Sequence, residues 1–147
     1  MQKTKSDFKV LSMLLLFLAA LDAVRIISNL VKNVNATPQA VANMAPELVK
    51  IAVIIAGVVS LALLLPDIFL GVRGIKIANG AEVTGRGHII WAKVLLVFSI
   101  IAAVLAVFDL FGSSDILMSL LSLATAAIDV FIYIFYIKYA NALRAAQ

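Results

Sequence analysis

Five charged residues stand within or at the edges of long apolar stretches of the sequence: Asp22, Arg25, Asp67, Asp109 and Asp129. An ionised side chain at the centre of a bilayer costs at least about 2.5–3.5 kcal/mol, so such residues mark either a polar contact between helices or a functional site. Asp22 and Arg25 are three residues apart, which places them on one face of a helix. Carboxylates in apolar surroundings bind protons or cations, and one arginine can hold two carboxylates through its planar set of donors.

The elements that must position these residues are four apolar runs, near residues 10–31, 48–72, 89–111 and 116–137. Each run reaches the roughly 20 residues that a helix needs to cross a bilayer. The chain is 64% hydrophobic and 14% charged, whereas a soluble domain has about 45–50% apolar and about 25% charged residues. The sequence therefore predicts an all-α membrane protein, an antiparallel bundle of four transmembrane helices that forms a single integral membrane domain over residues 1–147.

The basic residues are distributed unevenly between the ends of these runs. Nine of them precede the first run, surround the second connection or follow the fourth run, whereas two flank the first connection. The nine are Lys3, Lys5, Lys9, Arg73, Lys76, Arg86, Lys93, Lys138 and Arg144, and the two are Lys32 and Lys50. Because Lys and Arg accumulate on the cytoplasmic side, both termini are expected in the cytoplasm, with the protein in the cell membrane, a bacterial inner membrane. The basic rim would also suit anionic lipid head groups.

Residues 1–23 permit a second interpretation, a cleavable signal peptide. The basic start and the apolar run "VLSMLLLFLAAL" followed by small residues fit that pattern. However, apolar character resumes directly as "VRIISNLV", and Leu is a poor third residue before either cleavage point. An uncleaved first span is therefore the expected form.

The polar residues of the four runs fall on single faces when the runs are projected as helices, together with alanine, serine and glycine. Such stripes allow membrane helices to approach closely, so helix packing alone accounts for them. Asp22 and Asp129 have similar mid-membrane depths, which predicts a central cluster of Asp22, Arg25 and Asp129. Its charges sum to minus one, so a proton or a cation would complete it. Asp67 and Asp109 lie nearer the ends of their runs, where they would act as entrance groups.

Two local signals concern the second run and its end. Pro66 lacks a backbone donor and clashes with the preceding turn, so we expect a kink there. Asn79-Gly80 predicts a helix C-terminus.

Aromatic and histidine side chains near the basic side are expected at the interface. Tyr133, Tyr136 and Tyr139 fit an aromatic belt, and His88 is expected as a solvated boundary residue.

Several chemistries lack the residues that they need. The chain has no cysteine and one histidine, which excludes disulfides, thiolate metal sites and bis-histidine haem or histidine-rich zinc sites. Its glycines lack the strand context of phosphate-binding loops. No cofactor, metal or nucleic acid is expected as a ligand, and the lipid bilayer is the expected environment.

The segment "DIFLGVRGIKIANGAEVTGRGHIIWAKVLL" resembles the corresponding part of small uncharacterised four-span bacterial membrane proteins. In those proteins a glycine-containing helix end, a short polar turn and an Arg/Lys-flanked next span recur. The resemblance covers about thirty residues and implies a membrane location without an activity.

Short connections leave no soluble domain for catalysis, so the leading expectation is a non-enzymatic membrane protein, a small accessory or assembly subunit that acts with itself or with a membrane partner. The alternative is a small ion- or proton-coupled transporter or channel that uses the Asp/Arg cluster. Closely packed helices leave little internal volume, so a pore would need an oligomer or a bundle opened at Pro66. A membrane enzyme is a third class, disfavoured because a deep carboxylate cluster is inaccessible to water-soluble substrates.

Overall fold

The computed structural model describes residues 2–35, 46–82, 85–112 and 116–146, and these ranges are almost entirely helical. The helices are α1 (Gln2–Asn35), α2 (Pro46–Ala62), α3 (Leu65–Ala78), α4 (Gly87–Gly112) and α5 (Ile116–Ala145). In the described chain α2 and α3 together form one membrane-length stretch, so four stretches are long and apolar enough to cross a bilayer. Helices suit these sequences because hydrocarbon offers no partner to the backbone, which must satisfy its hydrogen bonds internally. The prediction of an all-α protein with four candidate spans is confirmed.

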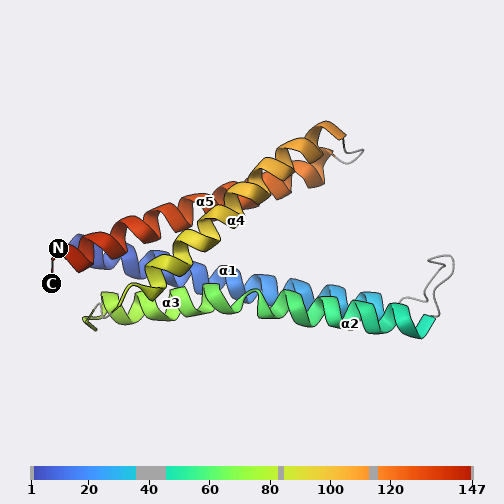
Figure 1. Cartoon of the computed structure of the whole chain (residues 1–147), viewed down its shortest axis with the longest axis horizontal. Helices are drawn as coiled ribbons and strands as arrows, with labels where there is room; N and C mark the ends of the chain where they lie inside the picture. Colours follow the sequence, from blue (N-terminus) through green and yellow to red (C-terminus); the bar gives the residue numbers. More distant parts are fainter. Residues whose placement is uncertain (1, 36–45, 83–84, 113–115, 147) are drawn as a thin grey trace.

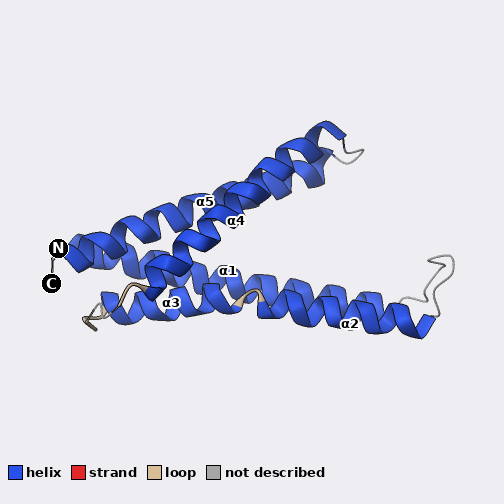
Figure 2. Cartoon of the chain, viewed as in Figure 1, coloured by secondary structure: helices blue, strands red, loops and turns tan. Residues whose placement is uncertain are grey.

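The second span is interrupted two residues before Pro66, as Figure 2 shows by the loop between α2 and α3. Leu63 N donates to Val59 O at 3.0 Å and Leu64 N to Leu61 O at 3.1 Å, so the last turn of α2 tightens. Pro66 occupies the first turn of α3, where its missing donor costs little. The helix is therefore interrupted directly before Pro66, at the position where a kink was expected.

The end of α3 forms a Schellman motif. Gly80 has a positive φ of 103°, its N–H donates to Ile77 O, and Ala81 N donates to Lys76 O, both at 3.0 Å. Asn79 is the C-cap residue. The predicted stop at Asn79-Gly80 is confirmed, and it frees the chain to turn toward α4.

The helices form two arms that meet at one end of the molecule and diverge toward the other (Figure 1). One arm consists of α1 with α2 and α3, and the other consists of α4 and α5. Both termini and the α3–α4 connection lie at the joined end (Figure 1). Contacts of α1 with α5 and of α3 with α4 hold the arms together. The helix ends that carry the nine basic residues thus lie at the joined end, whereas the C-terminal end of α1 and the N-terminal end of α2, which carry Lys32 and Lys50, lie at the open end.

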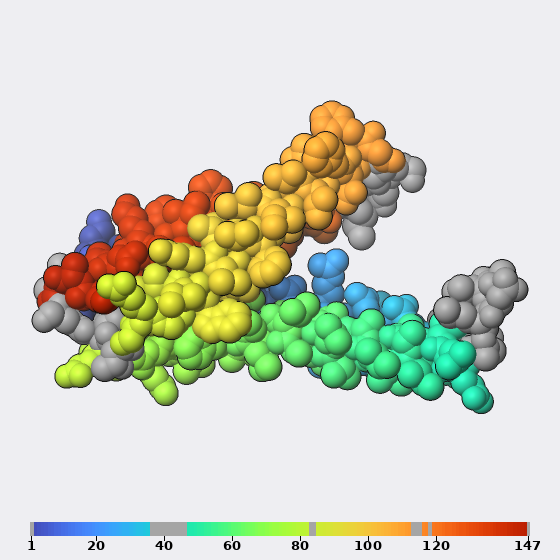
Figure 3. All heavy atoms as spheres, in the orientation of Figure 1, coloured from blue at the N-terminus to red at the C-terminus, as the bar shows by residue number. Residues whose placement is uncertain are grey.

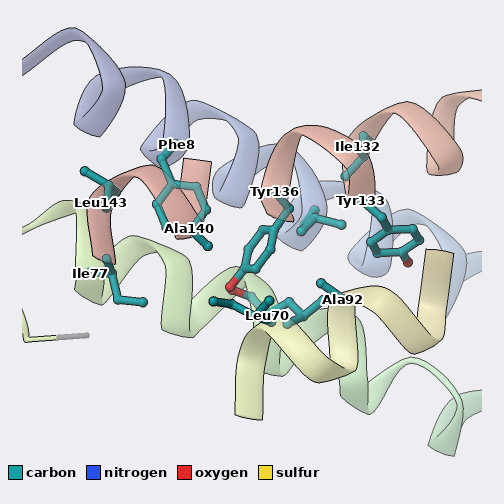
Figure 4. Close-up of a cluster of buried hydrophobic side chains, with 11 residues drawn as sticks. Phe8, Leu70, Ile77, Ala92, Ile132, Tyr133, Tyr136, Ala140 and Leu143 are labelled. Atoms are coloured by element: carbon teal, nitrogen blue, oxygen red, sulfur yellow. The ribbon is translucent and has the colours of Figure 1, made fainter. Parts of the chain in front are cut away.

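The buried core lies at the joined end, which we call the joint (Figure 4). Phe8 and Tyr136 are completely buried with ring centroids 4.9 Å apart, and the Tyr136 hydroxyl donates to Leu70 O at 3.0 Å across to α3. Small residues bring α1 and α3 together, because a Cβ on Gly71 would lie 2.6 Å from Leu16 Cγ. The small-residue faces predicted from the sequence therefore pack tightly in the joint.

The same faces are open toward the far end of the arms. Ala52 and Ala56 on α2 and Ser122 and Thr125 on α5 are exposed, although they continue the stripes that are buried in the joint. Large apolar side chains are exposed along the spans, Phe98 and Phe131 among them. This surface suits a hydrocarbon environment, and the divergence of the arms leaves part of the interhelical face uncovered.

Candidate functional site

The polar site begins with a hydrogen bond between the two arms. The Tyr133 hydroxyl of α5 donates to the Asp67 Oδ1 of α3 at 2.5 Å. Tyr133 is only 5% exposed, and Asp67 is half-buried in the first turn of α3, directly after Pro66. The break in the second span therefore positions Asp67, and the fourth span positions its donor.

Two further carboxylates gather near Asp67. Asp22 of α1 and Asp129 of α5 lie close enough to each other and to Asp67 for their charges to interact. Asp129 precedes Tyr133 by one helical turn, so both project from the same face of α5. Three spans thus contribute one carboxylate each to a group that we call the carboxylate cluster: Asp22, Asp67 and Asp129.

Arg25 lies beside this cluster without neutralising it. Within the described residues, no hydrogen bond or ion pair joins Arg25 to Asp22 or to Asp129. Arg25 and Asp129 instead line one open cleft of about 400 Å³, with Arg25 on α1 and Asp129 on α5. The cleft also contains Ser99, Ser122 and Thr125. The space-filling view shows the molecule hollowed between the two arms (Figure 3).

The structure brings together four of the five charged residues singled out in the sequence and leaves one apart. Arg25 and Asp129 line one cleft, and Asp22 is near enough to Asp129 for their charges to interact. The described residues form no ion pair among these three side chains. Asp67, predicted at an entrance, belongs to the carboxylate cluster. Asp109 is exposed on α4 and has no hydrogen bond or ion pair within the described part of the chain.

Two expectations about aromatic and histidine residues were wrong. Tyr133 and Tyr136 were expected in an interfacial belt, but they are 5% and 0% exposed and their hydroxyls bond to α3. His88 was expected to be solvated, but it is 2% exposed and packs edge-on against Tyr136, with ring centroids 6.4 Å apart. The close approach of α3, α4 and α5 at the joint buries them. The sequence did contain an indication that Tyr133 faces the other helices, because it lies one turn after Asp129 on the polar face of the same run.

The carboxylate cluster does not resemble a metal centre in the described residues, where no three His, Cys, Asp or Glu side chains are grouped closely enough to hold a metal ion. A phenol hydrogen-bonded to a carboxylate with two further carboxylates nearby is instead suited to binding and passing protons. Repulsion between the three carboxylates falls when one of them is protonated or when a cation enters the cleft.

Comparison with known proteins found no matching family model, curated protein or solved structure.

Proposed function

We propose that the chain is a small proton-coupled membrane transporter whose coupling group is the carboxylate cluster. The observation that carries this proposal is that carboxylates from three spans gather around the hydrogen bond from Tyr133 to Asp67, while Arg25, the nearby cation, is paired with neither Asp22 nor Asp129 in the described structure. Structural charges in a membrane are normally paired, because an unpaired charge in hydrocarbon is costly. Carboxylates left without such a partner are suited to exchange a proton.

The proposal includes an orientation in the membrane. The four spans are antiparallel, and both termini face the cytoplasm of a bacterial cell. The basic residues support this orientation, because they gather at the joined end with the termini and the α3–α4 connection. The cleft would then open away from the cytoplasm, and the basic rim would contact anionic lipid head groups.

Proton flux into proteoliposomes that contain a trapped pH-sensitive dye tests this function. Wild-type protein should accelerate acidification under an imposed potential, and Asp129→Asn and Asp22→Asn should reduce the rate at least tenfold. Asp109→Asn is the matched control, because it removes the same charge from a span but lies outside the cluster. Tyr133→Phe keeps the ring and removes only the donor to Asp67, so it should also slow the flux.

The proposal fails if wild-type vesicles acidify no faster than protein-free vesicles, or if the cluster variants match Asp109→Asn. Helical content and monodispersity of each variant must equal those of the wild type, so that a loss of flux is not a loss of fold.

A second candidate function is a non-enzymatic accessory or assembly subunit. The exposure of Asp22 and Arg25 where the arms diverge supports it, since lipid chains solvate charges poorly and a partner helix would cover them. Gentle purification followed by crosslinking in native membranes separates the two candidates. A chain that stays monomeric without a crosslinked partner contradicts the assembly role.

A further inference from the structure

The cleft beside the carboxylate cluster has a lining that favours one class of solute. Its opposite charges come from different arms, Arg25 from α1 and Asp129 from α5. The remaining polar groups are the hydroxyls of Ser99, Ser122 and Thr125, and the apolar wall includes Phe98. The volume of about 400 Å³ lies in the range of small-molecule sites, about 300–1,000 Å³.

The two charges are separated, and each is available to a ligand. They line the same cleft, yet no ion pair or hydrogen bond joins them in the described structure. Arg25 presents a planar set of donors that suits a carboxylate or a phosphate. Asp129 offers acceptors to an ammonium group, with Asp22 and Asp67 near enough to strengthen its negative field.

The charge pattern discriminates among simple ions. An anion bound to Arg25 would face the negative field of Asp129 and its two neighbouring carboxylates, and a cation bound to Asp129 would face Arg25. A ligand that carries both charges pairs with each side and leaves neither of these cleft charges unpaired. The apolar wall accepts the hydrocarbon part of such a ligand, and Phe98 can face a quaternary ammonium.

We infer that the cleft binds a small zwitterion, with its anionic group on Arg25 and its ammonium group on Asp129. This inference rests on the proposed transport function and names its substrate class. The same chemistry occurs in a free amino acid or betaine and in a zwitterionic lipid head group.

Equilibrium binding to protein in nanodiscs of phosphatidylglycerol tests the class, because that lipid is anionic and cannot mimic the ligand. Two matched series serve as probes: leucine against isopentylamine and 4-methylpentanoate, and glycine betaine against choline and 3,3-dimethylbutanoate. In at least one series the zwitterion should bind at least tenfold more tightly than both of its singly charged analogues. If neither zwitterion is preferred, or if no probe binds, a soluble source of the ligand is ruled out, and the class is overturned when the lipid measurement below is negative as well.

The lipid source is measured separately. Native mass spectrometry of protein exchanged into equal phosphatidylethanolamine and phosphatidylglycerol should show preferential retention of phosphatidylethanolamine if the ligand is a head group. Preferential retention that Arg25→Gln and Asp129→Asn both remove supports a lipid zwitterion. Equal retention of the two lipids, together with no zwitterion preference among the soluble probes, overturns the class.

Charge-selective variants provide the strictest test. Arg25→Gln should weaken zwitterion binding by about 10- to 100-fold while sparing the cation, and Asp129→Asn should weaken it similarly while sparing the anion, because each removes one charged hydrogen-bond partner. Asp109→Asn should change neither affinity. An equal effect of both variants on all probes would overturn the assignment of the two groups.

The outcomes distinguish this inference from the function on which it rests. Zwitterion binding without proton flux would support the binding site and contradict the proposed proton-coupled transport. Proton flux without zwitterion preference would support the proposed transport and contradict this substrate class.

Discussion

The contact between α1 and α3 at Gly74 makes a quantitative prediction about what holds the joint together. A Cβ on Gly74 would overlap the Ser12 Oγ, lie 2.9 Å from Ser12 Cβ and lie 3.2 Å from Tyr136 Cε2. Ser12 is completely buried, and its Oγ donates to Phe8 O at 2.7 Å, so it has little freedom to move away. Gly74→Ala should therefore force α3 away from α1.

The expected magnitude follows from two opposing terms. Overpacking a well-packed site costs about 1–3 kcal/mol, and the obstacle here is a short side chain close to its own backbone, which places the cost near 3 kcal/mol. Alanine regains about 1 kcal/mol of helix propensity over glycine. The net loss of stability should be about 2 kcal/mol.

Gly57→Ala is the matched control. Its added Cβ would approach Leu30 Cδ1 at 2.8 Å, the far end of a flexible side chain, on a half-exposed face of α2. The leucine side chain can rotate away, so overpacking should cost little. The gain in helix propensity from glycine to alanine should then raise the stability by up to about 1 kcal/mol.

Denaturation by SDS in micelles, followed through the fluorescence of the single tryptophan, Trp91, measures both changes. Ser12→Gly in the Gly74→Ala background removes both colliding atoms and should recover most of the loss, giving a coupling energy above about 1 kcal/mol. The reasoning is refuted if Gly74→Ala is as stable as Gly57→Ala, or if the two joint substitutions are simply additive.

Substitutions at three further positions test individual features of the fold. Tyr136→Phe should cost about 1 kcal/mol in the same denaturation assay, because it leaves the ring in place and removes one buried hydrogen bond to Leu70 O; an unchanged midpoint would show that the bond contributes nothing. Gly80→Ala should cost about 1 kcal/mol through its φ of 103° alone, since nothing lies within 4 Å of the added Cβ, and Gly80→Asn should cost less. Pro66→Ala restores a backbone donor, so hydrogen exchange near residues 63–66 should slow as α2 and α3 become continuous; unchanged exchange would mean that the proline does not cause the break.

The sequence determined the elements that depend on local chemistry. Long apolar runs give helical stretches of membrane length, the second of them is interrupted directly before Pro66, and it ends at Asn79-Gly80 because glycine accepts a positive φ. The 3.6-residue period also predicted that the small and polar residues of each run share one helix face. These predictions succeed because their causes lie within one or two helical turns.

Only the tertiary structure decided which of these faces meet and which remain open. The bond from Tyr133 to Asp67 joins residues 66 apart, and it depends on how α5 crosses α3, which no local pattern specifies. The burial of His88 likewise follows from the meeting of helices at the joint. The divergence of the arms leaves Arg25 and Asp129 in one cleft without pairing them, because the angle between helices reflects the sum of many packing contacts.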